Sequence, residues 1–417
     1  MKSYGGCVET KPLAFQENNA ARDRKFLGLG KNVFITGLVS FFMDVSSEMI
    51  YPLVPLFLSN VLGANKSLIG LIEGIAESTA SLLKVFSGWF SDKIGRRKGL
   101  MAAGYAISTL SRPLVALASG WHQVLGSRFM DRFGKGVRTS PRDAIIAESA
   151  DKRYLGRAFG FHRSMDTMGA VVGPALAFFF LGIFSNDYRK VFWLSMVPGI
   201  LAVLLIVFFI AEKARGVEHA NRPKLTLRHF DGRFRWFLLV VTVFALGNSS
   251  DVFLILRAQQ VGMPPVTIPL VYLFFNLIYS LTSVIAGVAA DRFGRKRIII
   301  SGFLLFALVY YGFATAANTK TIWILFGFYG IFMGLTEGVQ KAFLTTIIPA
   351  DFKATAFGVY NTAIGLAMFP ASLIGGWLWD RISPSATFYL GMTTALAATA
   401  LFLAFSMRQR TKAPELP

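Results

Sequence analysis

Acidic side chains recur at helical spacing inside apolar segments in the first half of this 417-residue chain. Asp44 and Glu48 are four residues apart and Tyr51 lies three further on, so the three share one face of a helix. Glu73 and Glu77 repeat the four-residue spacing in the next apolar segment. A carboxylate beside cations can hold or release a proton as its burial and charge pairing change. The pattern therefore indicates proton-coupled chemistry inside a membrane, where ionisable side chains are costly and face water or one another.

A second pattern, in the segment 122–148, is a stripe of basic residues. At about 100° per residue the stripe falls within an arc of roughly 120°, and Asp131 lies inside the same arc. A stripe of that charge facing lipid would not survive insertion, so we expect it to line a cavity or a protein interface. Its basic members are Arg128, Arg132, Lys135, Arg138 and Arg142.

Neighbouring segments add candidates to the same site. Lys84 lies seven residues beyond the second acid of its segment and therefore on the same helix face. Arg112 comes in the outer part of the third segment. In the fifth segment His162 and Asp166 are four residues apart, and Arg163 stands beside them.

The second half of the chain carries fewer ionisable groups in its apolar segments. Its candidates are Asp251, Glu337 and the amide of Asn361. Glu337 occupies the place that Lys135 holds in the first half, at an offset of 202 that other matched pairs share. We therefore expect ion coupling in the first half, and packing and substrate shape in the second.

The elements that must position these residues are long apolar stretches. A composition of 54% hydrophobic and 16% charged residues does not suit a water-exposed surface. A helix needs about 20 apolar residues to span a bilayer, where no backbone group can stay unpaired. The sequence predicts an all-α membrane protein with twelve spans, near 33–59, 67–89, 99–119, 122–148, 155–184, 191–211, 235–258, 267–289, 298–317, 321–348, 354–379 and 385–406.

The net charge of +20 is distributed as membrane topology requires. Lys and Arg gather in segments that all fall on one side when twelve spans are threaded, which places both termini in the cytoplasm of a cell inner-membrane protein and argues against a nucleic-acid partner. No signal peptide is expected. The predicted parts are a cytoplasmic tail (1–31), a six-helix bundle (32–211), a basic cytoplasmic loop (212–234), a second six-helix bundle (235–406) and a C-terminal tail (407–417).

Several classes of protein are disfavoured by what the sequence contains. One cysteine, Cys7, allows no internal disulfide, and four scattered histidines do not make a soft-metal site. No phosphate-binding Gly-x-x-x-x-Gly-Lys loop or metal-hydrolase histidine pair is present. We therefore expect neither an enzyme nor ATP-driven transport, and neither a metal site nor a cofactor.

A phrase of the form Gly-x-x-x-Asp-x-x-Gly-Arg occurs twice, after the second and the eighth predicted span, 199 residues apart. Its glycines permit close helix approach and a tight turn, and its Asp can pair with a cation or cap a helix. With a repeat of six and six spans, the chain resembles the major facilitator superfamily over its whole length. The resemblance implies a latch between the halves on the cytoplasmic face, closed when the protein faces outward. The positions concerned are Gly88, Asp92, Gly95 and Arg96, and Gly287, Asp291, Gly294 and Arg295.

Two further likenesses refine this resemblance. Gly126-Ser-Arg128, with Ala147-Glu148 further on, is similar to the family's fourth-helix arginine motif, which implies a role in proton coupling; Arg132 stands where that motif more often has a small residue. The runs 44–52 and 138–143 resemble bacterial permeases, a subgroup with members linked to metal resistance and siderophore handling.

The leading interpretation is a proton-coupled secondary transporter that works by alternating access. The basic stripe favours an anionic or carboxylate-rich solute, such as a siderophore or organic acid. One alternative is divalent-metal efflux (Fe, Ni, Co or Mn), with the four acids as hard oxygen ligands. Another is multidrug export, although such a cavity is expected to be less charged. The expected partners are a small-molecule substrate, protons and the lipid bilayer, and the expected functional unit is a monomer.

Overall fold

The computed structural model describes residues 30–94, 97–150, 155–211, 231–348 and 353–410, and within these ranges the chain is helical with no strand. The first half contains α1 (Lys31–Ile50), α2 (Val54–Asn60), α3 (Lys66–Ile94), α4 (Arg97–Leu117), α5 (Trp121–Ser149), α6 (Leu155–Ile183) and α7 (Tyr188–Phe209). The second contains α8 (Gly232–Gly247), α9 (Val252–Gln260), the 3₁₀ turn η3 (Pro265–Thr267), α10 (Ile268–Phe293), α11 (Arg295–Thr315), α12 (Thr319–Leu344), α13 (Lys353–Arg381) and α14 (Pro384–Arg410).

We call a helical pass from one end of the molecule to the other a crossing, and two of the crossings are interrupted. Pro52, which cannot continue the hydrogen-bonding pattern of a helix, follows α1 before α2 begins. Residues 248–251 separate α8 from α9, and Asn248 leaves the helical conformation at ψ 73°. When each interrupted pair is counted as one crossing, the fourteen α-helices of the described ranges make twelve crossings, which confirms the predicted helical fold. The sequence predicts the first and seventh spans as continuous, and the structure shows a break in each.

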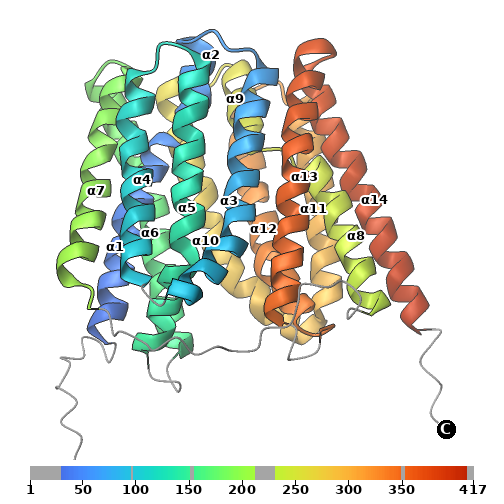
Figure 1. Cartoon of the computed structure of the whole chain (residues 1–417). Helices are drawn as coiled ribbons and strands as arrows, with labels where there is room; N and C mark the ends of the chain where they lie inside the picture. The colour runs from blue at the N-terminus through green and yellow to red at the C-terminus, as the bar shows by residue number, and fades with distance from the viewer. Residues whose placement is uncertain (1–29, 95–96, 151–154, 212–230, 349–352, 411–417) are drawn as a thin grey trace, which may run out of the picture.

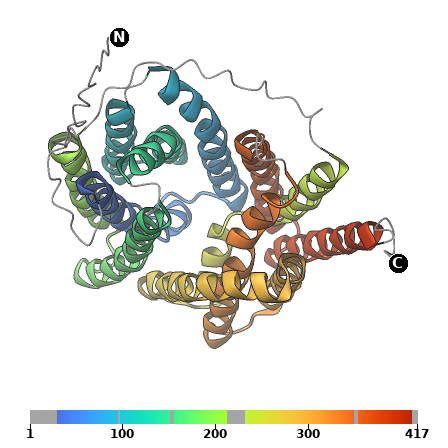
Figure 2. The same ribbon diagram turned by 90° about the horizontal axis from the view of Figure 1, so that it is seen from below.

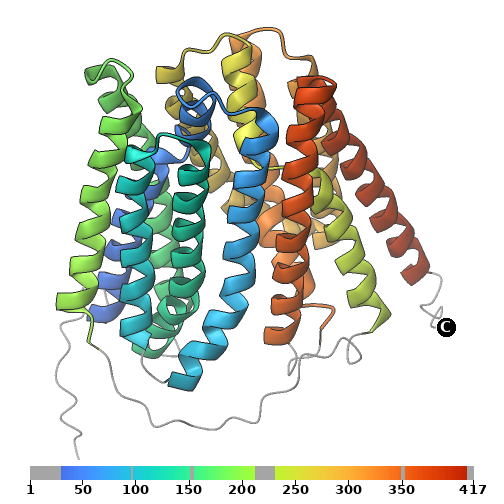
Figure 3. The ribbon, with the colours of Figure 1, turned by 45° about the horizontal axis from the view of Figure 1, so that its top comes forward.

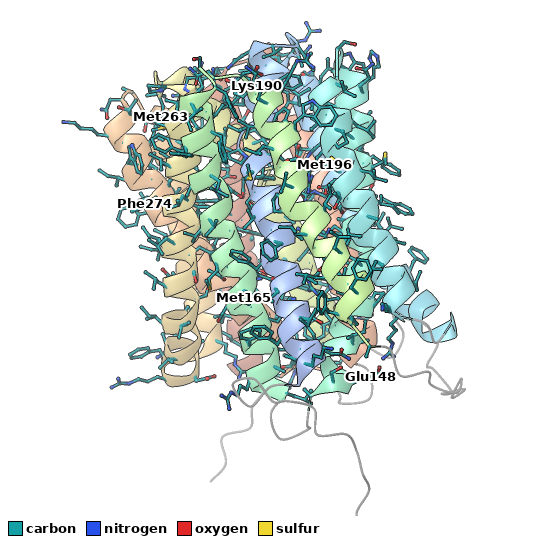
Figure 4. The ribbon with its side chains drawn as sticks, turned by 90° about the vertical axis from the view of Figure 1, so that its left-hand side faces the viewer. Glu148, Met165, Lys190, Met196, Met263 and Phe274 are labelled. Atoms are coloured by element: carbon teal, nitrogen blue, oxygen red, sulfur yellow. The ribbon has the colours of Figure 1, made fainter. Side chains whose placement is uncertain are left out.

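The helices form two groups, α1–α7 and α8–α14, that face each other across the centre of the molecule (Figures 1 and 2). α1 begins and α14 ends at the same end of the molecule. We call this the inner end, where Glu148 lies, and we call the opposite end, where Lys190 and Met263 lie, the outer end (Figure 4).

The two groups touch mainly toward the outer end. α3 packs along α13, α6 along α10, and the short outer elements α2 and η3 pack against α9 and α6 respectively. The inner ends of α3 and α13 diverge instead (Figures 1 and 3). The structure is therefore closed at the outer end, with α3 and α13 apart at the inner end.

Among the described helices, ten segments are long and apolar enough to cross a membrane by length and composition alone. The crossings that do not meet this criterion are α3 and α5. α3 carries the acidic pair Glu73 and Glu77, and α5 carries the basic stripe. The two helices pack against each other, and α3 also packs against the opposite group. The most charged helices thus lie in the interior of the assembly, away from the apolar faces.

Candidate functional site

The centre of the first group holds a buried ion pair between α3 and α5. Arg128 Nε donates to Glu73 Oε1 at 2.9 Å and Nη2 donates to Oε2 at 2.6 Å, which is the bidentate geometry of a strong charge-assisted pair. The side chains are only 4% and 1% exposed, respectively. α5 presents Arg128 toward α3 because the two helices run side by side, and Ala76 and Ala80 on α3 are buried along it.

Two further pairs continue along the stripe. Arg132, one turn beyond Arg128, lies 2.7 Å from Glu77 of α3, whose side chain is 25% exposed. Arg112 of α4 lies 3.2 Å from Asp131 of α5, and both are buried. The sequence placed these residues on shared faces but did not pair them; the structure brings three of the arginines against three acids on neighbouring helices.

Tyr51, at the end of α1, connects these pairs to the second group. Its ring lies 5.6 Å from the guanidinium carbon of Arg128 and 5.9 Å from that of Arg132, in cation–π range. On its other side the ring contacts Tyr272 of α10, with 5.3 Å between centroids. Charges and aromatic rings therefore meet where the two groups face each other.

Three further acids of the first group, Asp44, Glu48 and Asp166, have no arginine within ion-pair distance among the described residues. Asp44 and Glu48 lie on the face of α1 that meets α6, where Gly169 and Gly173 leave room for them. Glu48 Oε2 is buried without a hydrogen-bond partner. On α6, the Asp166 carboxylate lies 3.5 Å from His162 Nδ1, while Asp166 Oδ1 and His162 Nε2 are likewise buried and unpartnered.

Three cations of the same interior have no carboxylate within ion-pair distance among the described residues. They are Lys84 on α3 and Lys135 and Arg138 on α5. Arg138 lies over the Tyr105 ring at 4.4 Å, and its Nη1 is buried without a hydrogen bond. Glu77, which is paired with Arg132, is an acid whose charge acts on both Lys84 and Lys135.

The second group contributes one half-buried acid and one cross-group cluster. Asp251, where α8 and α9 are separated, accepts a 2.6 Å hydrogen bond from Tyr329 of α12. Toward the inner end, Arg163 of α6 donates to the Tyr279 hydroxyl of α10 at 2.8 Å, and that hydroxyl is hydrogen-bonded to Glu337. Asn361 is half-buried on α13.

The repeated glycine–aspartate motif is only partly described. In the first copy Gly88 and Asp92 lie at the inner end of α3, with the side chain of Asp92 outside the description, and Gly95 and Arg96 lie outside the described residues. In the second copy Asp291 lies 3.3 Å from Arg295. Through the contacts of Arg295, this copy of the motif connects α11 to α10 and to α12.

The two glycines of the second copy, Gly287 and Gly294, have different surroundings. Gly294 ends α10 at φ 95°, a conformation that favours glycine, and Arg295 donates to the Ala342 carbonyl of α12 at 2.9 Å. Gly287 has open space beside it.

Sequence reasoning missed three residues that connect the two groups or complete the site. Tyr272 and Tyr329 sit in aromatic-rich spans where nothing distinguishes a contact residue from a packing residue. Asp380 lies in the last turn of α13, where an acid opposes the helix dipole; that misplaced charge was the available signal.

The family model of the Major Facilitator Superfamily matches residues 36–256 and 236–417. The chain belongs to the major facilitator superfamily. An MFS-type transporter of Methanocaldococcus jannaschii is 36% identical over 394 residues, covering 93% of this chain and 97% of the relative. A homolog of the multi-drug resistance efflux pump PmrA, from Lactococcus lactis, is 24% identical and covers 89% of this chain and 92% of the relative.

The fold comparison agrees with this family assignment. A POT family transporter, crystallised with a thioalcohol-conjugated peptide, superposes with a TM-score of 0.79 at 14% identity, covering 93% of this chain and 98% of that one. Membership of the family makes this MFS chain a multi-pass membrane protein and a transporter.

Proposed function

We propose that this MFS protein is a proton-coupled secondary transporter of a small anionic, carboxylate-rich solute, working by alternating access as a monomer in the cytoplasmic membrane. Family membership supports transport. The positive-inside distribution supports a cytoplasmic location for the inner end. The substrate class and the coupling ion rest on the side chains that remain unpaired in the interior.

The observation that carries the anionic substrate is the placement of Lys84 and Lys135. Neither ammonium group has a carboxylate within ion-pair distance among the described residues, and Glu77, whose charge acts on both, is already paired with Arg132. Cations in excess of acids at membrane depth are costly, and an anionic solute would balance them. The arginines of the stripe do not serve this purpose as well, because Arg128 and Arg132 are already neutralised by Glu73 and Glu77.

The coupling proton is proposed to reside on the unpaired acids of α1 and α6. An ionised carboxylate without a partner is costly in a low-dielectric interior, and protonation removes that cost. Glu48 Oε2 is buried and unpartnered, and the cations whose charges act on Glu48 include Lys135. An anion that binds Lys135 withdraws that positive charge from Glu48 and so changes its proton affinity, which couples the two ligands.

The proposal predicts a pH change when a substrate binds. Citrate and succinate added to weakly buffered, detergent-purified protein are expected to give a saturable proton exchange, followed with a pH electrode and paired with calorimetric binding. Lys135→Gln should weaken binding at least tenfold. Glu48→Gln should retain binding and lose the pH change.

Other outcomes would contradict the proposal in distinct ways. A proton signal from ethidium with none from the carboxylates would favour multidrug export, which the name of the Lactococcus relative supports as the second candidate. A signal from Mn²⁺ alone, lost in Glu73→Gln, would favour metal efflux. The pairing of Glu73 and Glu77 with arginines argues against this last alternative.

A further inference from the structure

The outer end of α3 depends on the opposite helix group to satisfy its first backbone donors. A helix leaves its first N–H groups without partners inside the helix. Asn65 Oδ1 accepts from Leu68 N at 2.9 Å, so the chain supplies that cap itself. The donors of Lys66 and Ser67 are instead bound by Asp380 of α13, at 3.2 Å and 2.7 Å, and the Ser67 hydroxyl donates to the same carboxylate at 2.7 Å.

Asp380 is poorly placed for its own helix and well placed for α3. It lies in the last turn of α13, where the partial negative charge of the helix end disfavours a carboxylate. The N-terminus of α3 carries the opposite partial charge and gives Asp380 three hydrogen bonds. The favourable interaction of this side chain is therefore made across the boundary between the two groups.

The backbones of α3 and α13 approach each other closely around this contact. A Cβ at Gly376 would lie 2.3 Å from the Lys66 carbonyl oxygen, and a Cβ at Gly70 would lie 2.2 Å from that of Ser372. Ser78 donates across the same boundary to the Gly365 carbonyl at 2.6 Å. In this conformation the outer parts of α3 and α13 are held together over several turns, with Asp380 at their extreme end.

We propose that Asp380 is an outer gate residue: its carboxylate caps α3 from the opposite group, stabilises the outer-closed state, and must release α3 when the outer end opens. The proposal rests on the alternating-access part of the proposed function, and it is independent of the substrate and of the coupling ion. It makes Asp380 a positioning residue for transport, acting through the conformational equilibrium.

The test is a distance measurement by double electron–electron resonance on protein that needs no substrate. Cys7 is the single native cysteine, so Cys7→Ser gives a cysteine-free background. Spin labels on His122→Cys and Ala317→Cys, both exposed at the outer end, report outer opening. Labels on Ala147→Cys and Arg297→Cys report the inner end.

Asp380→Ala is expected to raise the ratio of outer-open to outer-closed protein about fivefold, the typical effect of losing one helix cap. The inner distance should shorten in the same fraction of molecules. Asp380→Asn, which keeps one acceptor oxygen, should give a smaller shift. The matched control is Asp187→Ala, since Asp187 caps α7 at the outer end through Arg189 N and Lys190 N within one group.

Two results would overturn the proposal. One is an outer distance that Asp380→Ala leaves unchanged; the other is an equal change in Asp187→Ala. Gly70→Val separates this failure from failure of the proposed function, because its side chain must force α3 from α13 sterically. If Gly70→Val lengthens the outer distance and Asp380→Ala does not, only the gate role fails. If neither does, alternating access fails as well.

Discussion

Replacement of Arg128 by alanine is expected to lower the stability of the folded protein by about 3–5 kcal/mol, the usual cost of leaving one partner of a buried ion pair uncompensated. Glu73 would remain with its side chain 1% exposed and no cation in bidentate contact. SDS-induced unfolding of detergent-purified protein, followed by tryptophan fluorescence, measures the loss. We expect reduced yield of folded protein from membranes as a second sign.

The neighbouring pair provides the control. Arg132→Ala leaves Glu77, which is 25% exposed and can keep part of its hydration, so we expect less than half the loss seen with Arg128→Ala. A Glu73→Met/Arg128→Met double variant removes both charges, and it should recover most of the stability while losing transport. Equal losses in Arg128→Ala and Arg132→Ala would show that burial does not decide the cost.

Substitution of Gly70 by valine is expected to reduce transport more than tenfold while leaving each helix group folded. The Cβ alone would lie 2.2 Å from the Ser372 carbonyl oxygen, and its other close neighbour is Phe253, so every clash is with the opposite group. The outer end then cannot close, and one half of the transport cycle is lost. Uptake of citrate into proteoliposomes measures this loss of transport, and thermal unfolding of the purified variant separates it from misfolding.

Gly182→Val is the matched control, since Gly182 lies at the outer end of α6 with nothing within 4 Å of an added Cβ. It should transport as the parent protein does. Gly376→Val, with a Cβ 2.3 Å from the Lys66 carbonyl oxygen, should repeat the Gly70→Val result. Normal transport by both interface variants would mean that close contact of α3 and α13 is not part of the cycle.

Much of the fold follows from short-range features of the sequence. Apolar stretches of about 20 residues predict spans because a bilayer demands them, and the repeated Asp92 and Asp291 phrases predict two related halves. The interruption at residues 248–251 was not predictable in the same way. Asn248 and the serines after it interrupt an otherwise apolar span, but small polar residues also occur in continuous helices, and tertiary contacts decide between the two.

The sequence predicts which residues form the candidate site, but it does not predict which acid pairs with which arginine. Helical spacing places Arg128 and Arg132 on one face of α5, and Glu73 and Glu77 on one face of α3. Which acid meets which arginine depends on how α3 and α5 are set along each other, and no local pattern encodes that offset. The residues that Asp380 contacts on α3 lie more than 300 positions away in the sequence, so no local sequence pattern predicts these contacts either.

α3 and α5 are not apolar enough to count as membrane spans by length and composition, and this affects how the protein is inserted into the membrane. A charged residue near the centre of a helix adds about 2.5–3.5 kcal/mol to its insertion through the translocon, so neither helix partitions into lipid readily alone. Glu73 is synthesised 55 residues before Arg128, the side chain that neutralises it. We therefore expect α3 to remain beside the translocon, in contact with insertion chaperones, until α5 emerges and the two helices enter the bilayer together.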